Sequence, residues 1–144
     1  FYLLLVSCKG RYIDPTGTYS LESETKIIEK DTYGYFGEIQ VKKITKKRIV
    51  MTFYTCQGAP SYNSGTLIDT LNYVNNAAIY STPEIDSSCC INFPFSNIGV
   101  SVKEKTEDFN FGCGFGHGVL ADGFFKKTSS AKPILRNPLT GGEI

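Results

Sequence analysis

The sequence is short of the residues on which many catalytic and metal-binding sites depend. It has no tryptophan, one methionine and one histidine, His117, so any histidine-based catalysis would have to use that side chain. The motifs G-x-S-x-G and H-E-x-x-H are absent, and no pair of cysteines has the C-x2-C spacing of a zinc site. An alternating strand would carry His117 and Asp122 to different places. We therefore expect no enzyme, no metal and no cofactor.

Neither sign of charge dominates the chain, and no helical repeat runs through it. The 15 basic and 14 acidic residues leave a net charge of +1, which creates no field that would gather nucleic acid. No window shows a sustained apolar repeat at i, i+3, i+4 and i+7. With 9 tyrosines, 10 phenylalanines and 14 glycines, the composition favours strands separated by turns. The sequence predicts an all-β fold.

About eight short strands can be traced from alternation and turn residues. Closure into a small antiparallel barrel or a curled sandwich would remove exposed strand edges, so we expect one such domain over residues 17–127. Residues 26–30 fit either a strand or one helical turn. The lysine-rich segment 42–48 is interpreted as a solvated hairpin turn, with contact to an anionic surface as the alternative. The candidate strands are 17–22, 38–42, 49–56, 66–74, 77–81, 89–95, 98–103 and 124–127.

The first residues form an apolar run too short to span a bilayer, which is typical of the end of a signal peptide. Residues 5–8, Leu-Val-Ser-Cys, resemble the lipobox of bacterial lipoproteins. The resemblance implies cleavage before Cys8, acylation of that cysteine and attachment to a membrane of the bacterial cell envelope. We expect a signal remnant at 1–7, a lipid-anchored tether at 8–16 and a disordered tail at 128–144. The alternative is a buried first strand with an inert cysteine.

With Cys8 assigned to lipid, four cysteines remain, which in an exported protein suggests two disulfides. Cys89 and Cys90 are adjacent and point to opposite faces of a strand, so they should have different partners. We favour Cys89–Cys113, which would join the glycine-rich segment 112–123 to the strand 89–95. Closing this loop of roughly 25 residues contributes on the order of 3.5 kcal/mol in the chain-entropy description. Cys56–Cys90 then follows by elimination.

Two segments near the C-terminus carry a resemblance to a known protein module. Residues 86–93 (DSSCCINF) and 113–126 (CGFGHGVLADGFFK) resemble a domain of small bacterial secreted proteins and lipoproteins, largely of uncharacterised function, that sometimes accompanies lysozyme-inhibitor-like domains. Phe125 stands where that module usually has tyrosine. The resemblance implies that Cys89 pairs with Cys113.

A looser likeness is to lipoprotein inhibitors of c-type lysozyme, because Tyr54-Thr-Cys56 is similar to their early Tyr-x-Cys. Their inhibitory loop is similar to Ser-Gly-x-x-Tyr, whereas the segment beginning at Ser64 lacks that tyrosine. We expect a protein or glycan partner in the envelope, with lysozyme as the most specific version. The alternatives are a barrel that holds a small apolar ligand, a structural envelope protein, and an enzyme that uses His117. The candidate contacts lie in two loops: Tyr62, Asn63, Ser64, Phe115 and His117.

Overall fold

The computed structural model describes residues 10–144, so Cys8 and the expected signal remnant lie outside the described residues. The described chain is almost entirely β, as expected, with one short 3-10 turn, η1. The elements are β1 (Gly17–Leu21), β2 (Lys26–Ile28), β3 (Asp31–Thr45), β4 (Arg48–Gly58), β5 (Ser64–Asn72), β6 (Ala77–Thr82), β7 (Asp86–Pro94), β8 (Gly99–Lys105), η1 (Gly112–Gly114) and β9 (Gly123–Ser129).

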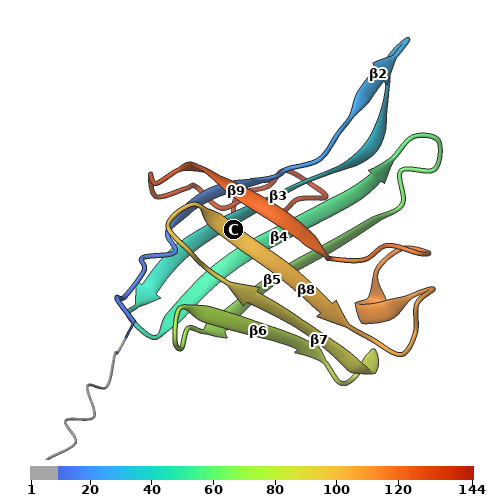
Figure 1. Cartoon of the computed structure of the whole chain (residues 1–144). Coiled ribbons are helices and arrows are strands. Elements are labelled where there is room, and N and C mark those ends of the chain that lie inside the picture. Colours follow the sequence, from blue (N-terminus) through green and yellow to red (C-terminus); the bar gives the residue numbers. More distant parts are fainter. Residues whose placement is uncertain (1–9) are drawn as a thin grey trace, which may run out of the picture.

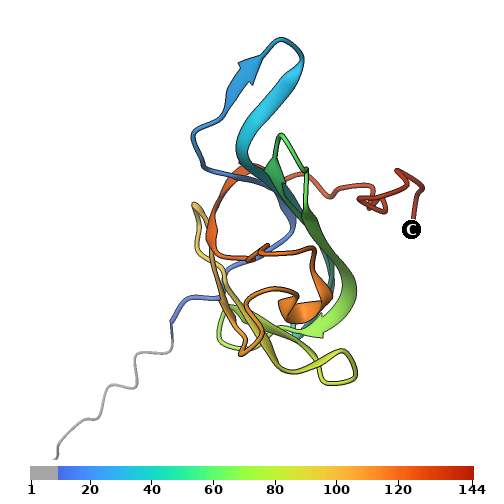
Figure 2. The same ribbon diagram turned by 90° about the vertical axis from the view of Figure 1, so that its right-hand side faces the viewer.

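The strands form one antiparallel sheet that curls into a nearly closed barrel (Figures 1 and 2). Their order around the barrel is β5-β4-β3-β1-β9-β8-β7-β6, and β2 pairs only with β3. The first strand therefore lies between β3 and β9, which brings residues near both ends of the folded chain side by side. The two edge strands are β5 and β6, which no ladder of hydrogen bonds joins.

Aromatic and aliphatic side chains fill the interior of the barrel. On β4, the alternation of side chains turns Ile49, Met51 and Phe53 inward, and all three are fully buried. The ring of Phe53 lies 5.8 Å from Phe93, 6.0 Å from Phe115 and 5.6 Å from Phe125, measured between ring centroids. Strands from opposite walls of the barrel therefore meet through one aromatic cluster.

The N-terminal segment packs against one end of the barrel instead of forming a tether. The backbone N–H of Ile13 donates to Oδ1 of Asn76 at 2.9 Å, and the Tyr73 hydroxyl donates to the carbonyl of Ile13 at 2.6 Å. Pro15 is buried, and its carbonyl accepts a 2.7 Å bond from the Tyr19 hydroxyl. The expectation of a free tether over 8–16 is wrong for residues 11–16, because turn 73–76 supplies partners that their local composition does not reveal.

The expected disordered tail is also different in the structure. Strand β9 extends to Ser129, and beyond it a small hairpin pairs Arg136 with Glu143. Leu135 is buried, and residues 136–138 border a cavity of about 280 Å³ with Thr52 and Tyr54 on the outer face of β4. This cover explains why Thr52 is buried although it points out of the barrel. Composition alone indicated disorder because the surface that the tail covers, which includes Thr52 and Tyr54, belongs to a strand far away in the sequence.

Strands β2 and β3 form a hairpin that projects from the barrel wall (Figure 1). Residues 26–28 are thus a strand, which decides between the two interpretations of this segment. The lysine-rich segment 42–48 does contain a hairpin turn, but the turn is confined to Lys46 and Lys47: residues 42–45 belong to β3, and Thr45 pairs with Arg48 at the start of β4.

Replacing Phe53 with alanine should lower the free energy of unfolding by about 3–5 kcal/mol, because it opens a cavity where three other rings converge. Urea unfolding followed by circular dichroism measures the loss. The control is Phe109→Ala, which removes an exposed ring and should change the free energy by no more than about 0.5 kcal/mol. Equal losses in the two variants would contradict the described core.

Candidate functional site

The glycine-rich segment between β8 and β9 forms a loop across one end of the barrel (Figure 2). The disulfide Cys89–Cys113 is present, with Cα atoms 5.1 Å apart, and joins η1 to β7 as expected. Cys113 itself has a φ of 60°, in the left-handed region that non-glycine residues seldom adopt. The disulfide therefore holds a compact turn beside the wall of the barrel.

Asp86 at the start of β7 fastens the same turn by hydrogen bonds. Its Oδ1 accepts from the Ser88 hydroxyl at 2.6 Å, and its Oδ2 accepts from the Thr106 hydroxyl at 2.7 Å and from the N–H of Cys113 at 3.1 Å. These donors, first the Ser88 hydroxyl, hold the pKa of Asp86 well below its usual range. The sequence analysis did not single out this carboxylate, although Asp-x-Ser is a common turn-forming pattern.

The two loops proposed from the sequence lie against each other in the structure. The carbonyl of His117 accepts hydrogen bonds from the side-chain amides of Asn63, at 3.2 Å, and Gln57, at 3.4 Å. The N–H of Gly116 donates to the carbonyl of Ser64 at 2.9 Å. A Cβ on Gly116 would lie 3.0 Å from that carbonyl oxygen, so the close approach of the two backbones favours glycine.

Phe115 is buried, so it cannot serve as the partner contact expected from the sequence. Its ring stacks on Phe53 with an interplanar angle of 15° and closes the interior of the barrel. A Cβ on Gly65 would lie 2.4 Å from the Phe115 ring, so β5 needs glycine at the point where the ring enters. His117, two residues further on, is exposed, because the chain bends at Gly116 and turns at His117 instead of continuing as a strand that would place both side chains on one face.

Tyr62 links the loop at 57–65 to the projecting hairpin. Its hydroxyl donates to Oδ1 of Asp31 at 2.8 Å and accepts from the N–H of Thr32 at 3.2 Å. The bond to Asp31 raises the pKa of the Tyr62 hydroxyl, because it favours the protonated phenol. One face of the ring remains exposed. Tyr62 is thus a fixed aromatic side chain at the surface.

Exposed apolar side chains surround these residues at the same end of the barrel. Phe111 is 56% exposed, and its ring lies 5.4 Å from the His117 ring. Phe109 and Ile85 are each 71% exposed. The sequence analysis missed these three, because a large apolar residue in a loop is more often part of a core. We call the following exposed or half-exposed residues the loop site: Tyr62, Asn63, Ser64, Phe111 and His117.

The second expected disulfide is wrong: Cys56 and Cys90 are both free thiols. Cys56 on β4 stands between Phe36 of β3 and Ser64 of β5, whereas Cys90 on β7 stands between β6 and β8. The two cysteines thus belong to different walls of the barrel. The prediction of Cys56–Cys90 assumed that every remaining cysteine forms a disulfide. It fails because the order of the strands keeps these two cysteines apart.

In the described chain, the carboxylates of Asp122 and Glu104 do not form hydrogen bonds with the side chains of the loop site. Oδ1 of Asp122 accepts a 2.7 Å bond from the backbone N–H of Glu104, and no hydrogen bond joins a carboxylate to the His117 ring within residues 10–144. Both carboxyl oxygens of Glu104 are buried without a hydrogen-bond partner. Burial first, and then the negative charge of Asp122, raise the pKa of Glu104 to about 7. The site therefore presents binding groups and no assembled acid-base pair.

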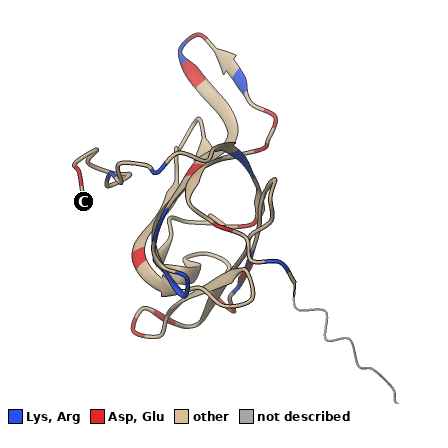
Figure 3. Cartoon of the chain, turned by 90° about the vertical axis from the view of Figure 1, so that its left-hand side faces the viewer, with Lys and Arg blue, Asp and Glu red and all other residues tan. Residues whose placement is uncertain are grey.

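The rest of the described chain adds two observations about ligands and membranes. The described residues contain no group of three or more histidine, cysteine or acidic side chains that could hold a metal ion. From Gly10 onward, no helix has the length and apolarity needed to cross a bilayer. Basic and acidic residues are interspersed over the barrel (Figure 3).

Comparison with known proteins found no match: no family model, no curated protein and no solved structure is similar to this chain. The site is therefore interpreted from its own geometry.

Asp86→Asn should lower the free energy of unfolding near pH 6. In this variant the free energy of unfolding should also change less between pH 6 and pH 2 than it does in the wild type. Because the folded-state pKa is depressed, the carboxylate stabilises the fold above the unfolded pKa of about 3.9, and this contribution is lost as pH falls through the folded pKa. Urea unfolding from pH 6 down to pH 2 should show the variant and wild type converging. Ser88→Ala, which removes one donor, should reproduce part of the effect. An undiminished difference at pH 2 would count against this role.

Glu104→Gln should raise the free energy of unfolding above pH 7 and should have a smaller effect on it at pH 4. The folded state holds the Glu104 proton more tightly than the unfolded chain, whose glutamate pKa is about 4.3. Stability therefore falls as pH rises from about 4 through about 7, and glutamine removes that loss. Thermal unfolding at both pH values measures the effect, with Glu107→Gln, at an exposed position, as the control. Destabilisation by Glu104→Gln at pH 8 would contradict it.

Proposed function

We propose that this chain is a binding protein of the bacterial cell envelope that holds a protein or glycan partner at the loop site. The main observation in support of this proposal is that exposed aromatic side chains lie on loops that a disulfide and hydrogen bonds hold in place. Fixed loops lose little conformational freedom on binding, so more of the contact energy becomes affinity. Aromatic side chains in such loops commonly supply most of the binding energy at an interface.

The position of residues 11–16, the first part of the described chain to pack on the barrel, supports an orientation for this proposal. Residues 11–16 pack on turn 73–76, at the opposite end of the barrel from η1 (Figure 1). If Cys8 carries lipid, the loop site faces away from the membrane. The exposed lysines of the β3–β4 turn lie at the N-terminal end, where they would face anionic headgroups.

The filled interior favours an external partner over a small apolar ligand in the barrel. Phe53, Phe115 and Phe125 occupy the space that such a ligand would need. Inhibition of a c-type lysozyme is the most specific form of the proposed function, and it rests on the resemblance of Tyr54-Thr-Cys56 to those inhibitors. A structural role in the envelope is the alternative.

The test is a binding and inhibition assay of the purified chain against c-type lysozyme and peptidoglycan. Phe111→Ala and His117→Ala should each weaken binding by about tenfold, in line with loss of a central aromatic contact. Tyr62→Phe keeps the ring and loses the bond to Asp31, so a smaller effect is expected. The matched control is Ile98→Ala, which removes an exposed apolar side chain in the turn between β7 and β8.

If all four variants bind as strongly as the wild type, the partner must bind to a surface other than the loop site. Failure of the chain to bind either lysozyme or peptidoglycan would remove the inhibitor version and favour the structural alternative.

A further inference from the structure

The barrel has a seam between β5 and β6, at which the sheet does not close. These strands follow one another in the chain, yet they are the two ends of the strand order. Only the bridge between Val74 and Ala77 joins them, at the turn. At the other end, η1 and the following residues fill the seam through the bond from Gly116 to Ser64. Between these two points lies the open edge of β5.

Hydrogen-bond directions identify which backbone groups face the seam. In an antiparallel strand, alternate residues direct both backbone polar groups to the same side. The carbonyl of Asn63 accepts from Gln57, toward β4, whereas that of Ser64 accepts from Gly116, away from β4. The register of β5 with β4 is continuous from Ser64 to Asn72. The backbone groups of Thr66, Ile68 and Thr70 therefore point into the seam.

The facing edge of β6 is open in the same way. Ala77 exchanges two backbone bonds with Val74 across the turn and stands opposite Pro94, which has no N–H to donate to it. Ile79, two residues further along, consequently directs its backbone groups away from β7 and into the seam. Unpaired edges on both sides make this a place where an added strand can form main-chain hydrogen bonds.

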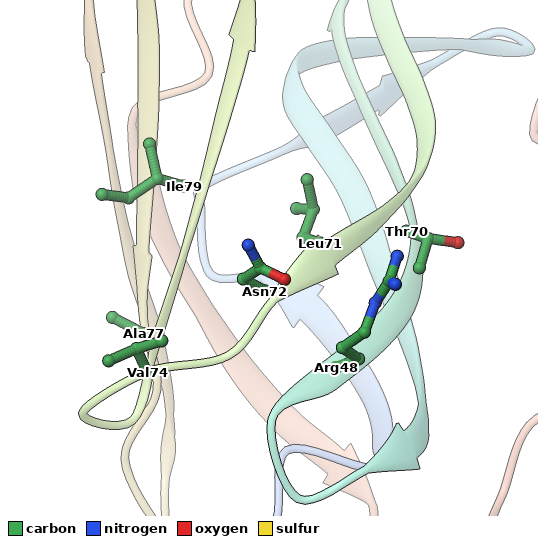
Figure 4. Close-up of a pocket in the computed structure, with 7 residues that line it drawn as sticks. All are labelled: Arg48, Thr70, Leu71, Asn72, Val74, Ala77 and Ile79. Carbon is green, nitrogen blue, oxygen red and sulfur yellow. The ribbon is translucent and has the colours of Figure 1, made fainter.

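A cavity of about 430 Å³ lies at this seam, toward the turn (Figure 4). Leu71 projects between Ile79 on β6 and the β4–β5 side, where Arg48 and Thr70 lie. The cavity thus combines an apolar centre with a basic side chain at one wall. Its size suits a few side chains of an extended peptide.

Asp69 controls what kind of strand fits. It lies on β5 opposite Met51, whose side chain is inside the barrel, yet Asp69 itself is exposed through the opening. Its Oδ1 accepts a 2.8 Å hydrogen bond from the backbone N–H of Thr70. This N–H faces the seam, so the carboxylate takes up a donor that an added strand would need. After burial, the charge of Asp69 also contributes to a raised pKa of Tyr80 on β6, which faces it across the seam. An inward-pointing charge of this kind discourages pairing with an arbitrary strand.

We propose that the seam binds an extended peptide segment of another protein, which pairs antiparallel with β5 and places a basic side chain opposite Asp69. The basic side chain draws the carboxylate away from Thr70 and frees the edge for main-chain pairing. An acidic side chain of the same peptide, near Asn72, meets Arg48. This site is separate from the loop site and does not depend on the function proposed for it.

The test uses the full chain and the blocked peptide Thr-Glu-Val-Thr-Lys-Val-Thr, whose lysine falls opposite Asp69 in the antiparallel register. Binding measured by calorimetry should weaken by about tenfold when that lysine is changed to glutamate. Asp69→Lys should reverse the preference between the two peptides. Equal affinity for both peptides, or a preference that Asp69→Lys leaves unchanged, would overturn the assignment.

A matched pair of variants tests the main-chain pairing. Ile68→Pro removes an N–H that faces the seam and should weaken peptide binding by about tenfold or more, whereas Ile68→Ala keeps the N–H and should bind nearly as well. Amide exchange on the wild-type chain gives a readout that needs no variant: the Ile68 amide should gain protection when the peptide binds. Unchanged exchange, or equal loss of binding in both variants, would overturn the proposal. So would loss of a dimer in Ile68→Pro with no change in peptide binding, because the seam would then join two copies of this chain.

Discussion

The disulfide between Cys113 and Cys89 and the hydrogen bond from Gly116 to Ser64 hold the glycine-rich loop across one end of the barrel. Strands β5 and β6 diverge from their shared turn, and the glycine-rich loop fills the wide part of the opening. It fastens to β7 on one side and to β5 on the other. Phe115 can then enter the interior and stack on Phe53, which completes the aromatic cluster. The core and the candidate surface thus depend on the same loop.

The same arrangement separates the stable part of the molecule from its binding groups. Phenylalanines fill the interior, so the barrel acts as a scaffold, while Phe111 and His117 stand outside on the loop that Phe115 secures. The two loops are joined by the backbone bond from Gly116 to Ser64 and by the side-chain amides of Asn63 and Gln57, which donate to the backbone carbonyl of His117. Since these bonds use only the backbone of His117, the exposed rings of Phe111 and His117 remain available for a partner.

Short-range patterns predicted much of this fold. Alternation of apolar residues at 38–42, the apolar run at 49–56 and the turn residues between strands identified the antiparallel all-β architecture, and the density of glycines identified the loop that carries Cys113. Four of the five proposed contact residues belong to a single site: Asn63 and Ser64 are hydrogen-bonded to His117 and its neighbour Gly116, and Tyr62 precedes Asn63 in the same loop. Phe115 was misassigned because a phenylalanine between two glycines has the same local pattern whether its ring faces solvent or the core. The roles of Asp86 and Glu104 were not predicted, because Thr106 and Cys113, which donate to Asp86, lie far along the chain, and the burial of the Glu104 carboxyl group arises only in the folded barrel.

By itself the sequence determined the class of fold and most of the strands and turns, since these follow from local periodicity and turn residues. It also favoured the pairing of Cys89 with Cys113, which the resemblance implied and the structure confirms. Tertiary structure alone decided the strand order, the free state of Cys56 and Cys90, the docking of residues 11–16 and of the C-terminal hairpin, and the seam between β5 and β6. The physical reason is that each of these depends on which strands become neighbours. Closure of the sheet sets those neighbours through contacts between residues far apart in the chain, and no local pattern encodes them.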